Sequence, residues 1–143
     1  NVTLLTNGDI VLVFEGQGVD NTSVYYEYGT FDNDEVSWHT NGIPYDNGLQ
    51  PSIAALDNGR SLKTHKSESD GHLWLSTNKV VDPHLIWRIG ETEKYEPHNS
   101  NNPVMLQLDN GYILSMFDSN QSNGTWNRMG EVSSNGQEVE WTT

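Results

Sequence analysis

An Asn-Gly pair recurs three times in the chain, each time between two apolar runs. The glycines are Gly8, Gly59 and Gly111, which lie 51 and 52 residues apart. A two-residue hairpin loop of type I′ requires positive φ at both central positions, and Asn followed by Gly adopts this conformation at the lowest cost. The spacing therefore predicts three β-hairpins, one in each of three copies of a unit of about fifty residues.

Each unit continues with two further strand-like segments, so we expect four strands per unit. The expected strands span residues 2–6, 10–15, 23–28 and 36–38, then 52–56, 60–66, 71–77 and 85–89, then 104–108, 112–117, 125–129 and 138–141. No window keeps the apolar spacing of an amphipathic helix, and Gly or Pro interrupts too often. The sequence predicts an all-β fold of three four-stranded antiparallel repeats in a single domain, with repeats at 1–48, 49–98 and 99–143.

Two architectures use four-stranded units of this kind. A β-propeller arranges blades of about 40 to 50 residues around a channel, and a β-trefoil closes three such repeats into one domain. The unit length favours propeller blades, whereas the count of three favours the trefoil.

The second strand of each hairpin shows how such units would pack. Its two faces are both largely apolar in units one and three, which suits a strand buried between two layers. Unit two instead carries Lys63 and His65 at these positions. Because three blades cannot close a ring and would expose apolar faces, a propeller requires a longer chain or a homo-oligomer, most simply a dimer that closes a six-bladed ring.

Composition excludes several classes of partner. The chain carries 20 acidic and 7 basic residues, for a net charge of -13, and this field would repel a nucleic-acid backbone. No apolar run approaches the length of about 20 residues that spans a membrane. The absence of cysteine excludes disulfides and thiolate zinc sites, and the histidines lack metal-binding spacing. We therefore expect no metal and no cofactor.

Several short motifs resemble those of known repeats. Tyr-Asp-x-Gly at 45–48, Pro-Ser-Ile-Ala at 51–54 and His-Lys-Ser at 65–67 resemble tandem repeats of secreted, propeller-like proteins. The segment 67–74 resembles the aspartate box of sialidase-type blades, with its aspartate displaced and Leu73 in place of threonine. These motifs mark structure more than chemistry. Because many such proteins bind glycans, the resemblance implies a lectin-like, extracellular protein.

Carbohydrate recognition requires an aromatic face for the sugar ring and planar polar groups for its hydroxyls. Each repeat offers both at equivalent places. The candidate ligand-binding residues are Tyr25 with Glu15, Trp74 with His65, Lys66 and Asp70, and Trp126 with Asp118. Equivalent sites would combine weak contacts into avidity. Under the alternative interpretation these aromatic residues pack between units, as we expect of Trp38, Trp87 and Trp141 near the repeat ends.

The sequence nominates no catalytic residue. No pair can be chosen among 20 acidic side chains, and Arg60, Arg88 and Arg128 stand at unrelated repeat positions. The leading hypothesis is a non-catalytic, multivalent carbohydrate-binding protein. The alternatives are a glycoside hydrolase or sialidase-like propeller fragment, and a structural adhesion protein.

Overall fold

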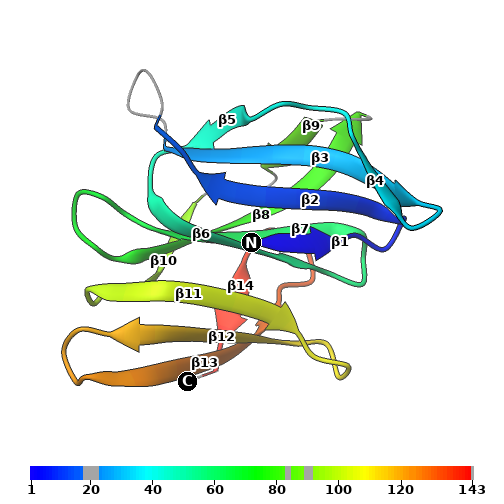
Figure 1. Ribbon diagram of the computed structural model, residues 1–143. Helices are drawn as coiled ribbons and strands as arrows, with labels where there is room; N and C mark the ends of the chain where they lie inside the picture. The colour runs from blue at the N-terminus through cyan, green and yellow to red at the C-terminus, as the bar shows by residue number, and fades with distance from the viewer. Residues whose placement is uncertain (18–22, 83–84, 89–91, 143) are drawn as a thin grey trace.

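The computed structural model describes residues 1–17, 23–82, 85–88 and 92–142, with residues 80–82 and 85–88 described by their backbone alone. These residues form β-strands joined by turns and contain no helix. The strands make three separate antiparallel sheets (Figure 1). The all-β prediction is confirmed.

The three sheets follow one another along the chain, and we number them in that order. Sheet 1 contains β1 (Val2–Leu4), β2 (Asp9–Glu15), β3 (Val24–Asp32), β4 (Glu35–Trp38) and β5 (Ile43–Asp46). Sheet 2 contains β6 (Leu49–Ala55), β7 (Arg60–Lys66), β8 (Leu73–Asp82), β9 (Leu85–Arg88) and β10 (Glu93–Glu96). Sheet 3 contains β11 (Ser100–Gln107), β12 (Tyr112–Ser119), β13 (Gly124–Val132) and β14 (Val139–Trp141).

Each sheet has four strand positions, in agreement with the predicted repeat. In sheet 1, β4 pairs with residues 29–32 of β3 while β5 pairs with residues 24–26, so the fourth position is divided into two short strands. The same division occurs in sheet 2, where β9 and β10 pair with opposite ends of β8. Sheet 3 has the simple order β11-β12-β13-β14. The described strands of different sheets are not joined in one ladder, so neither a trefoil-like barrel nor a closed ring of blades is formed by this chain.

The sheets stack in chain order, with sheet 2 between the other two (Figure 1). One apolar cluster joins sheets 1 and 2 and includes Leu5, Val11, Val13, Tyr26, Tyr28 and Ile53. A second joins sheets 2 and 3 and includes Leu56, Leu62, Leu73, Leu75, Tyr95, Met105, Ile113 and Phe117. Sheet 2 therefore contributes both of its faces to the core.

The first strands of the sheets, β1, β6 and β11, are linked by side chains. Asn1 Oδ1 accepts a hydrogen bond from the Ile53 N–H at 3.0 Å, and Thr3 Oγ1 accepts one from the Ala55 N–H at 3.2 Å. Between the next pair of sheets, Gln107 Oε1 accepts from the Asp57 N–H at 2.7 Å. These contacts hold neighbouring repeats together along one edge.

The predicted hairpins reverse at the expected glycines, but the loop type differs from the prediction. In the first hairpin, the Gly8 N–H donates to the Leu5 carbonyl at 3.0 Å, and φ is positive at Gly8 but not at Asn7. The loop is therefore a three-residue turn that ends in a left-handed glycine. Asn7 contributes through its side chain, because its Oδ1 accepts from the Asp9 N–H at 3.1 Å. The loops at Gly59 and Gly111 repeat these contacts.

The second hairpin strand shows how the sheets face one another. Side chains two, four and six residues after the glycine lie on one side of the sheet, which we call the rear face. Those three and five residues after it lie on the other side, the forward face. The forward faces of sheets 1 and 2 pack on the rear faces of sheets 2 and 3, respectively. Val11 and Val13 thus lie against sheet 2, whereas Ile113 and Phe117 face back toward it. The expectation that this strand is buried on both sides in units one and three is therefore wrong, because one neighbouring layer is missing in each case.

Tryptophan and glycine pair across the last strands of sheets 1 and 3. Gly29 is the register partner of Trp38, and Gly130 is the partner of Trp141. A Cβ at either glycine would lie about 3 Å from the indole, so the ring covers the bare backbone (Gly29 3.0 Å, Gly130 3.1 Å). Sheet 2 departs from this pattern, because the register partner of Trp87 is Lys79 and not a glycine. The side chain of Trp87 lies outside the described residues.

Candidate functional site

Two cavities open at the end of the stack opposite the Asn-Gly hairpins. The first pocket, of about 540 Å³, lies between sheets 1 and 2 and is lined by Asp46, Asn47, His65, Ser67, Glu68, Ser69, Trp74 and Thr92. The second pocket, of about 620 Å³, lies between sheets 2 and 3 and is lined by Glu96, Pro97, His98, Phe117, Ser119, Gln121, Ser122, Trp126, Asn127 and Arg128.

The two pockets occupy equivalent places in the repeat. Each is bounded by the connector that leaves one sheet and by the second and third strands of the next sheet. At the base of each is a cross-strand pair on the rear face, His65 with Trp74 in the first and Phe117 with Trp126 in the second. The stacking of repeats therefore generates the same kind of pocket twice.

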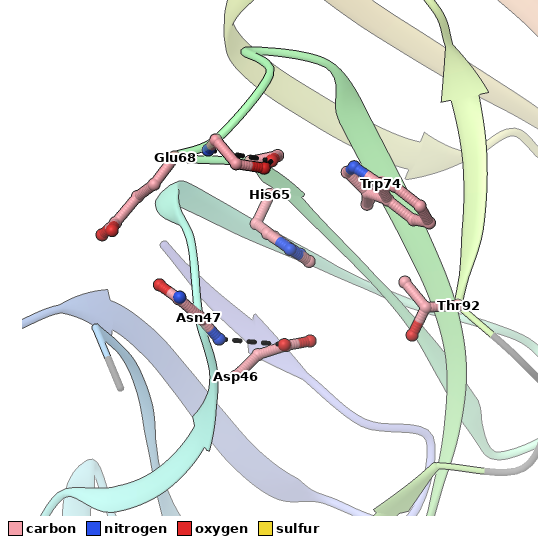
Figure 2. Close-up of a pocket in the computed structure, with 8 residues that line it drawn as sticks. Asp46, Asn47, His65, Glu68, Trp74 and Thr92 are labelled. Atoms are coloured by element: carbon pink, nitrogen blue, oxygen red, sulfur yellow. Dashed lines mark hydrogen bonds between the residues drawn. The ribbon is translucent and has the colours of Figure 1, made fainter. Parts of the chain in front are cut away.

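The first pocket places an indole opposite polar groups. Figure 2 shows Trp74 and Thr92 on one side, Asp46 and Asn47 on the other, and His65 between them. Because β7 and β8 are paired at this point, His65 and Trp74 project from adjacent strands. Asp46 is the last residue of β5 and Asn47 follows it, so this pocket requires two sheets.

The polar wall of the first pocket is fixed by hydrogen bonds. The Ser23 hydroxyl accepts a hydrogen bond from the Gly48 N–H at 3.0 Å, and its one proton can go to either of two acceptors, the Gly48 carbonyl at 2.7 Å or Glu68 Oε1 at 2.9 Å. Gly48 lies so close to His65 that an added Cβ would come within 2.1 Å of its ring. The connector and the turn after β7 are thereby held at a defined separation.

An ion pair between a buried lysine and a partly exposed aspartate forms part of this wall. Lys63 is 1% exposed, and its Nζ lies 2.6 Å from Asp46 Oδ2 and 4.3 Å from the centre of the Tyr45 ring. Burial alone would raise the pKa of the Asp46 carboxyl, but the charge and hydrogen bond of Lys63 outweigh it and hold this pKa below its usual value. Asp46 is therefore an ionised hydrogen-bond acceptor at the pocket wall.

The second pocket has a more exposed indole. Trp126 is 53% exposed, and its Nε1 donates to Ser122 Oγ at 2.6 Å, which orients the ring. On the opposite wall, His98 Nδ1 lies 2.7 Å from Glu96 Oε1. Arg128 donates to the backbone carbonyl of Tyr95 and lies 5.5 Å from the Trp141 ring. The pocket thus combines a solvent-facing indole with carboxylate, imidazole, amide and guanidinium groups.

Tyr95 supports the second pocket from below. It stacks on Trp141 with ring centres 5.1 Å apart, and its hydroxyl accepts hydrogen bonds from Thr64 and Ser115 at 3.2 Å each. Burial raises the pKa of the Tyr95 hydroxyl to about 12. Tyr45 has the corresponding place between sheets 1 and 2, where its hydroxyl donates to Asn78.

Of the residues predicted from sequence to bind ligand, the structure brings three into the pockets. His65 and Trp74 line the first pocket, and Trp126 lines the second. Because His65 is only 4% exposed, it forms the floor of the first pocket and not its rim.

The other predicted residues in sheets 2 and 3 make contacts outside the pocket linings. Lys66 donates to Asn101 Oδ1 at 2.5 Å. Asp70, in the turn before β8, lies 3.0 Å from Nζ of Lys94 in β10. Asp118 accepts a hydrogen bond from Thr125 Oγ1 at 3.1 Å. These side chains form hydrogen bonds or ion pairs within turns and with neighbouring strands.

Tyr25 and Glu15 lie in sheet 1, which has no sheet before it. Tyr25 stacks on Phe14 with ring centres 5.8 Å apart, and it is the repeat equivalent of Trp74. Glu15 Oε2 accepts a hydrogen bond from the Gln50 N–H at 3.0 Å. The aromatic half of a pocket is thus present in sheet 1 without a connector opposite it.

Sequence reasoning missed the connector residues, which supply one wall of each pocket. Asp46 and Asn47 belong to the Tyr-Asp-x-Gly motif, which the sequence analysis took as a mark of structure more than of chemistry. Glu96 and His98 follow Tyr95 in the corresponding connector. The recurrence of tyrosine followed by an acidic residue before each new unit was the available signal.

A comparison with models of protein families found no match to this chain, and a comparison with curated proteins found none either. In the described part of the chain, no group of three or more His, Asp or Glu side chains is placed to hold a metal ion. No described segment forms a helix that is long and apolar enough to cross a bilayer. The functional proposal therefore depends on the pockets themselves.

Proposed function

We propose that the protein is a non-catalytic carbohydrate-binding protein, which holds neutral saccharide units in its two repeat-related pockets. The observation that carries the proposal is the recurrence, between successive sheets, of a tryptophan on the third strand facing a polar connector. A packing residue would be covered by the neighbouring sheet, whereas Trp126 is more than half exposed.

The chemistry of the pockets suits a neutral sugar. An indole provides a flat apolar surface for the C–H face of a pyranose, and carboxylates and amides accept or donate hydrogen bonds to its hydroxyls. Asp46 with Asn47 in the first pocket and Glu96 with Asn127 in the second provide such groups. The net charge of -13 makes an anionic saccharide a poorer ligand.

Two carboxylates with a shifted pKa, Asp46 and Glu93, do not favour the glycoside hydrolase alternative. A glycosidase acid requires a raised pKa and an ionised partner across the bond. Asp46 is held ionised by Lys63. Burial raises the pKa of Glu93, but its carboxylate accepts a hydrogen bond from Trp141 Nε1 at 3.0 Å, away from both pocket linings.

The finer features of the proposal concern assembly and setting. Two pockets per chain would give four in a dimer, and linked weak sites raise the overall affinity. We place the protein outside the cell, where glycans are displayed, and regard its sheets as blades of a propeller-like assembly.

The proposal is tested by calorimetric titration with a panel of neutral oligosaccharides of different linkage, after screening on a glycan array. We expect two sites per chain. Trp74→Ala or Trp126→Ala should each weaken one site at least about tenfold, which corresponds to about 1.4 kcal/mol, and the double variant should abolish binding. Trp38→Phe, outside both pockets, should bind as the parent chain does.

Two outcomes would contradict the proposal. The first is a lack of binding to every saccharide at about 10 mM, which is weaker than the affinity range useful even for multivalent binding. The second is release of the chromophore from nitrophenyl glycosides in a manner that depends on Asp46 or Glu68, which would replace a binding protein with a hydrolase.

A further inference from the structure

We infer that the two outermost sheet faces are the two halves of one interface. The rear face of sheet 1 in one copy of the chain packs on the forward face of sheet 3 in a second copy. The reciprocal contact closes the pair into a ring of six sheets, three from each copy. This inference is independent of the saccharide proposal.

The repeat relation identifies the partner surface. Forward faces pack on rear faces at both contacts inside the chain, between sheets 1 and 2 and between sheets 2 and 3. The rear face of sheet 1 and the forward face of sheet 3 occupy the corresponding repeat positions, but none of the described strands packs against them. Each of these two faces is the repeat equivalent of a face that packs on a neighbouring sheet inside the chain. The surface that fits it is therefore the opposite face of a sheet of the same repeat.

The rear face of sheet 1 is a broad apolar surface. Strand register places its side chains on one face, since Val2 pairs with Leu12 and Leu4 pairs with Ile10. Val2 and Leu4 are 54% and 55% exposed. The apolar residues of this face are Val2, Leu4, Ile10, Leu12, Phe14, Tyr25, Phe31, Val36 and Trp38.

The forward face of sheet 3 is apolar over its first two strands, and β13 adds Met129 beside Asn127 and Glu131. Register again groups the side chains, since Val104 pairs with Met116 and Leu106 pairs with Leu114. Met116 is 42% exposed. The apolar residues of this face are Val104, Leu106, Leu114, Met116 and Met129. Contiguous apolar surfaces of this kind mark interaction sites on soluble proteins.

The geometry sets the symmetry of the contact. The two faces differ, so the contact is heterologous, and it can form a closed ring or an open fibre. Closure with two copies makes both contacts equivalent and leaves no apolar face in water. A pairing of two rear faces or two forward faces would leave the other kind of face exposed.

The test measures solution mass by light scattering and sedimentation over a range of protein concentrations. We expect the parent chain to have twice the 16.1 kDa chain mass at high concentration. Leu4→Lys on the rear face and Met116→Glu on the forward face should each weaken the dimer at least about 100-fold, because each variant brings a charge into both contacts. Ser134→Glu, in the exposed turn before β14, is the matched control and should remain dimeric.

Mixing the two variants provides the decisive measurement. A mixture of Leu4→Lys and Met116→Glu should recover a dimer, because one of its contacts is fully apolar and the other opposes lysine to glutamate. Circular dichroism of each variant confirms that its strands are intact. A variant that has lost its strands is replaced by Val2→Thr or Leu106→Thr at the same face.

Three results would overturn the inference. A parent chain that stays monomeric at every concentration would leave both faces to a different occupant. Loss of the dimer in one variant but not in the other would show that like faces pair. Growth into species larger than a dimer would show that the contact does not close.

Discussion

At the scale of single residues, the Lys63–Asp46 pair stands out because it joins a buried lysine to a carboxylate in the wall of the first pocket. The corresponding positions in the other two sheets are Leu12 and Ser115, so the pair is particular to sheet 2. Lys63 is 1% exposed and also contacts the Tyr45 ring, which packs between sheets 1 and 2. Removing Asp46 would leave the charge of Lys63 buried without compensation, whereas removing Lys63 would leave a carboxylate that is 21% exposed at the pocket wall.

We predict that Lys63→Met lowers the free energy of unfolding by about 2 kcal/mol at pH 7, because the partly exposed Asp46 carboxylate loses its charge-assisted hydrogen bond from Lys63. The double variant Lys63→Met, Asp46→Asn should recover most of the loss, since it removes both charges. Urea unfolding of the parent chain, the single variant and the double variant measures both effects. A single variant as stable as the parent chain would contradict the prediction.

The same pair gives the unfolding free energy a defined pH dependence. The folded-state pKa of Asp46 lies below its usual value of 3.8, so the stabilisation is fully present above about pH 4 and is lost as the pH falls through the lowered pKa. The difference between the parent chain and Lys63→Met should therefore shrink as the pH falls below about 4. A difference that stays constant across this range would assign the effect to packing instead of charge.

At the scale of elements, the three hairpin loops show how one local solution is used in every repeat. Each loop ends in a left-handed glycine, and each asparagine side chain accepts a hydrogen bond from the backbone two residues later. The glycine is required by conformation and not by space, since a Cβ at Gly59 would meet its nearest neighbour at an ordinary 3.6 Å.

We predict that Gly59→Ala lowers the free energy of unfolding by about 1–2 kcal/mol, because φ is +77° and a Cβ is disfavoured there. Gly59→Asn should cost less, since asparagine tolerates this conformation. The matched control is Gly124→Ala, where φ is not positive and the nearest atom to the new Cβ is 3.9 Å away. Thermal unfolding measures all three, and equal effects at the two glycines would contradict this explanation.

At the scale of the whole molecule, the distribution of charge opposes the dimer that the apolar faces favour. The chain has no lysine or arginine before Arg60, so the rear face of sheet 1 contains Glu27 without a cation from its own sheet. Around the forward face of sheet 3 lie further carboxylates, of which Glu131 and Glu140 are exposed. Two chains of net charge -13 therefore repel each other at the contact.

We predict that added salt tightens the dimer, because about 0.5 M NaCl reduces the range of charge repulsion to a few ångströms. Glu27→Gln should tighten it at least about threefold at low salt, since it removes a carboxylate from the apolar contact. Asp57→Asn, in the exposed loop of the central sheet, removes the same charge away from both faces and should have a smaller effect. Sedimentation at two salt concentrations checks the prediction, and a dimer that salt dissociates would contradict it.

The sequence by itself determined the repeat and its internal strands. The Asn-Gly pairs, the alternation of apolar residues and the absence of helical spacing are local signals, so the all-β class and the four strands per unit could be predicted. The loop type could not, because Asn-Gly fits both a two-residue turn and a three-residue turn that ends in glycine. Backbone hydrogen bonds such as that from Gly8 to Leu5 distinguish the two.

Only the tertiary structure decided what the repeats build between them. His65 and Trp74 were predictable as neighbours because they lie on paired strands, but Asp46 reaches them only when sheet 1 stacks on sheet 2. The same stacking leaves one face of sheet 1 and one of sheet 3 uncovered. Strand formation follows from residues adjacent in sequence, whereas a pocket or an interface depends on which faces of distant segments meet, and no local pattern records that choice.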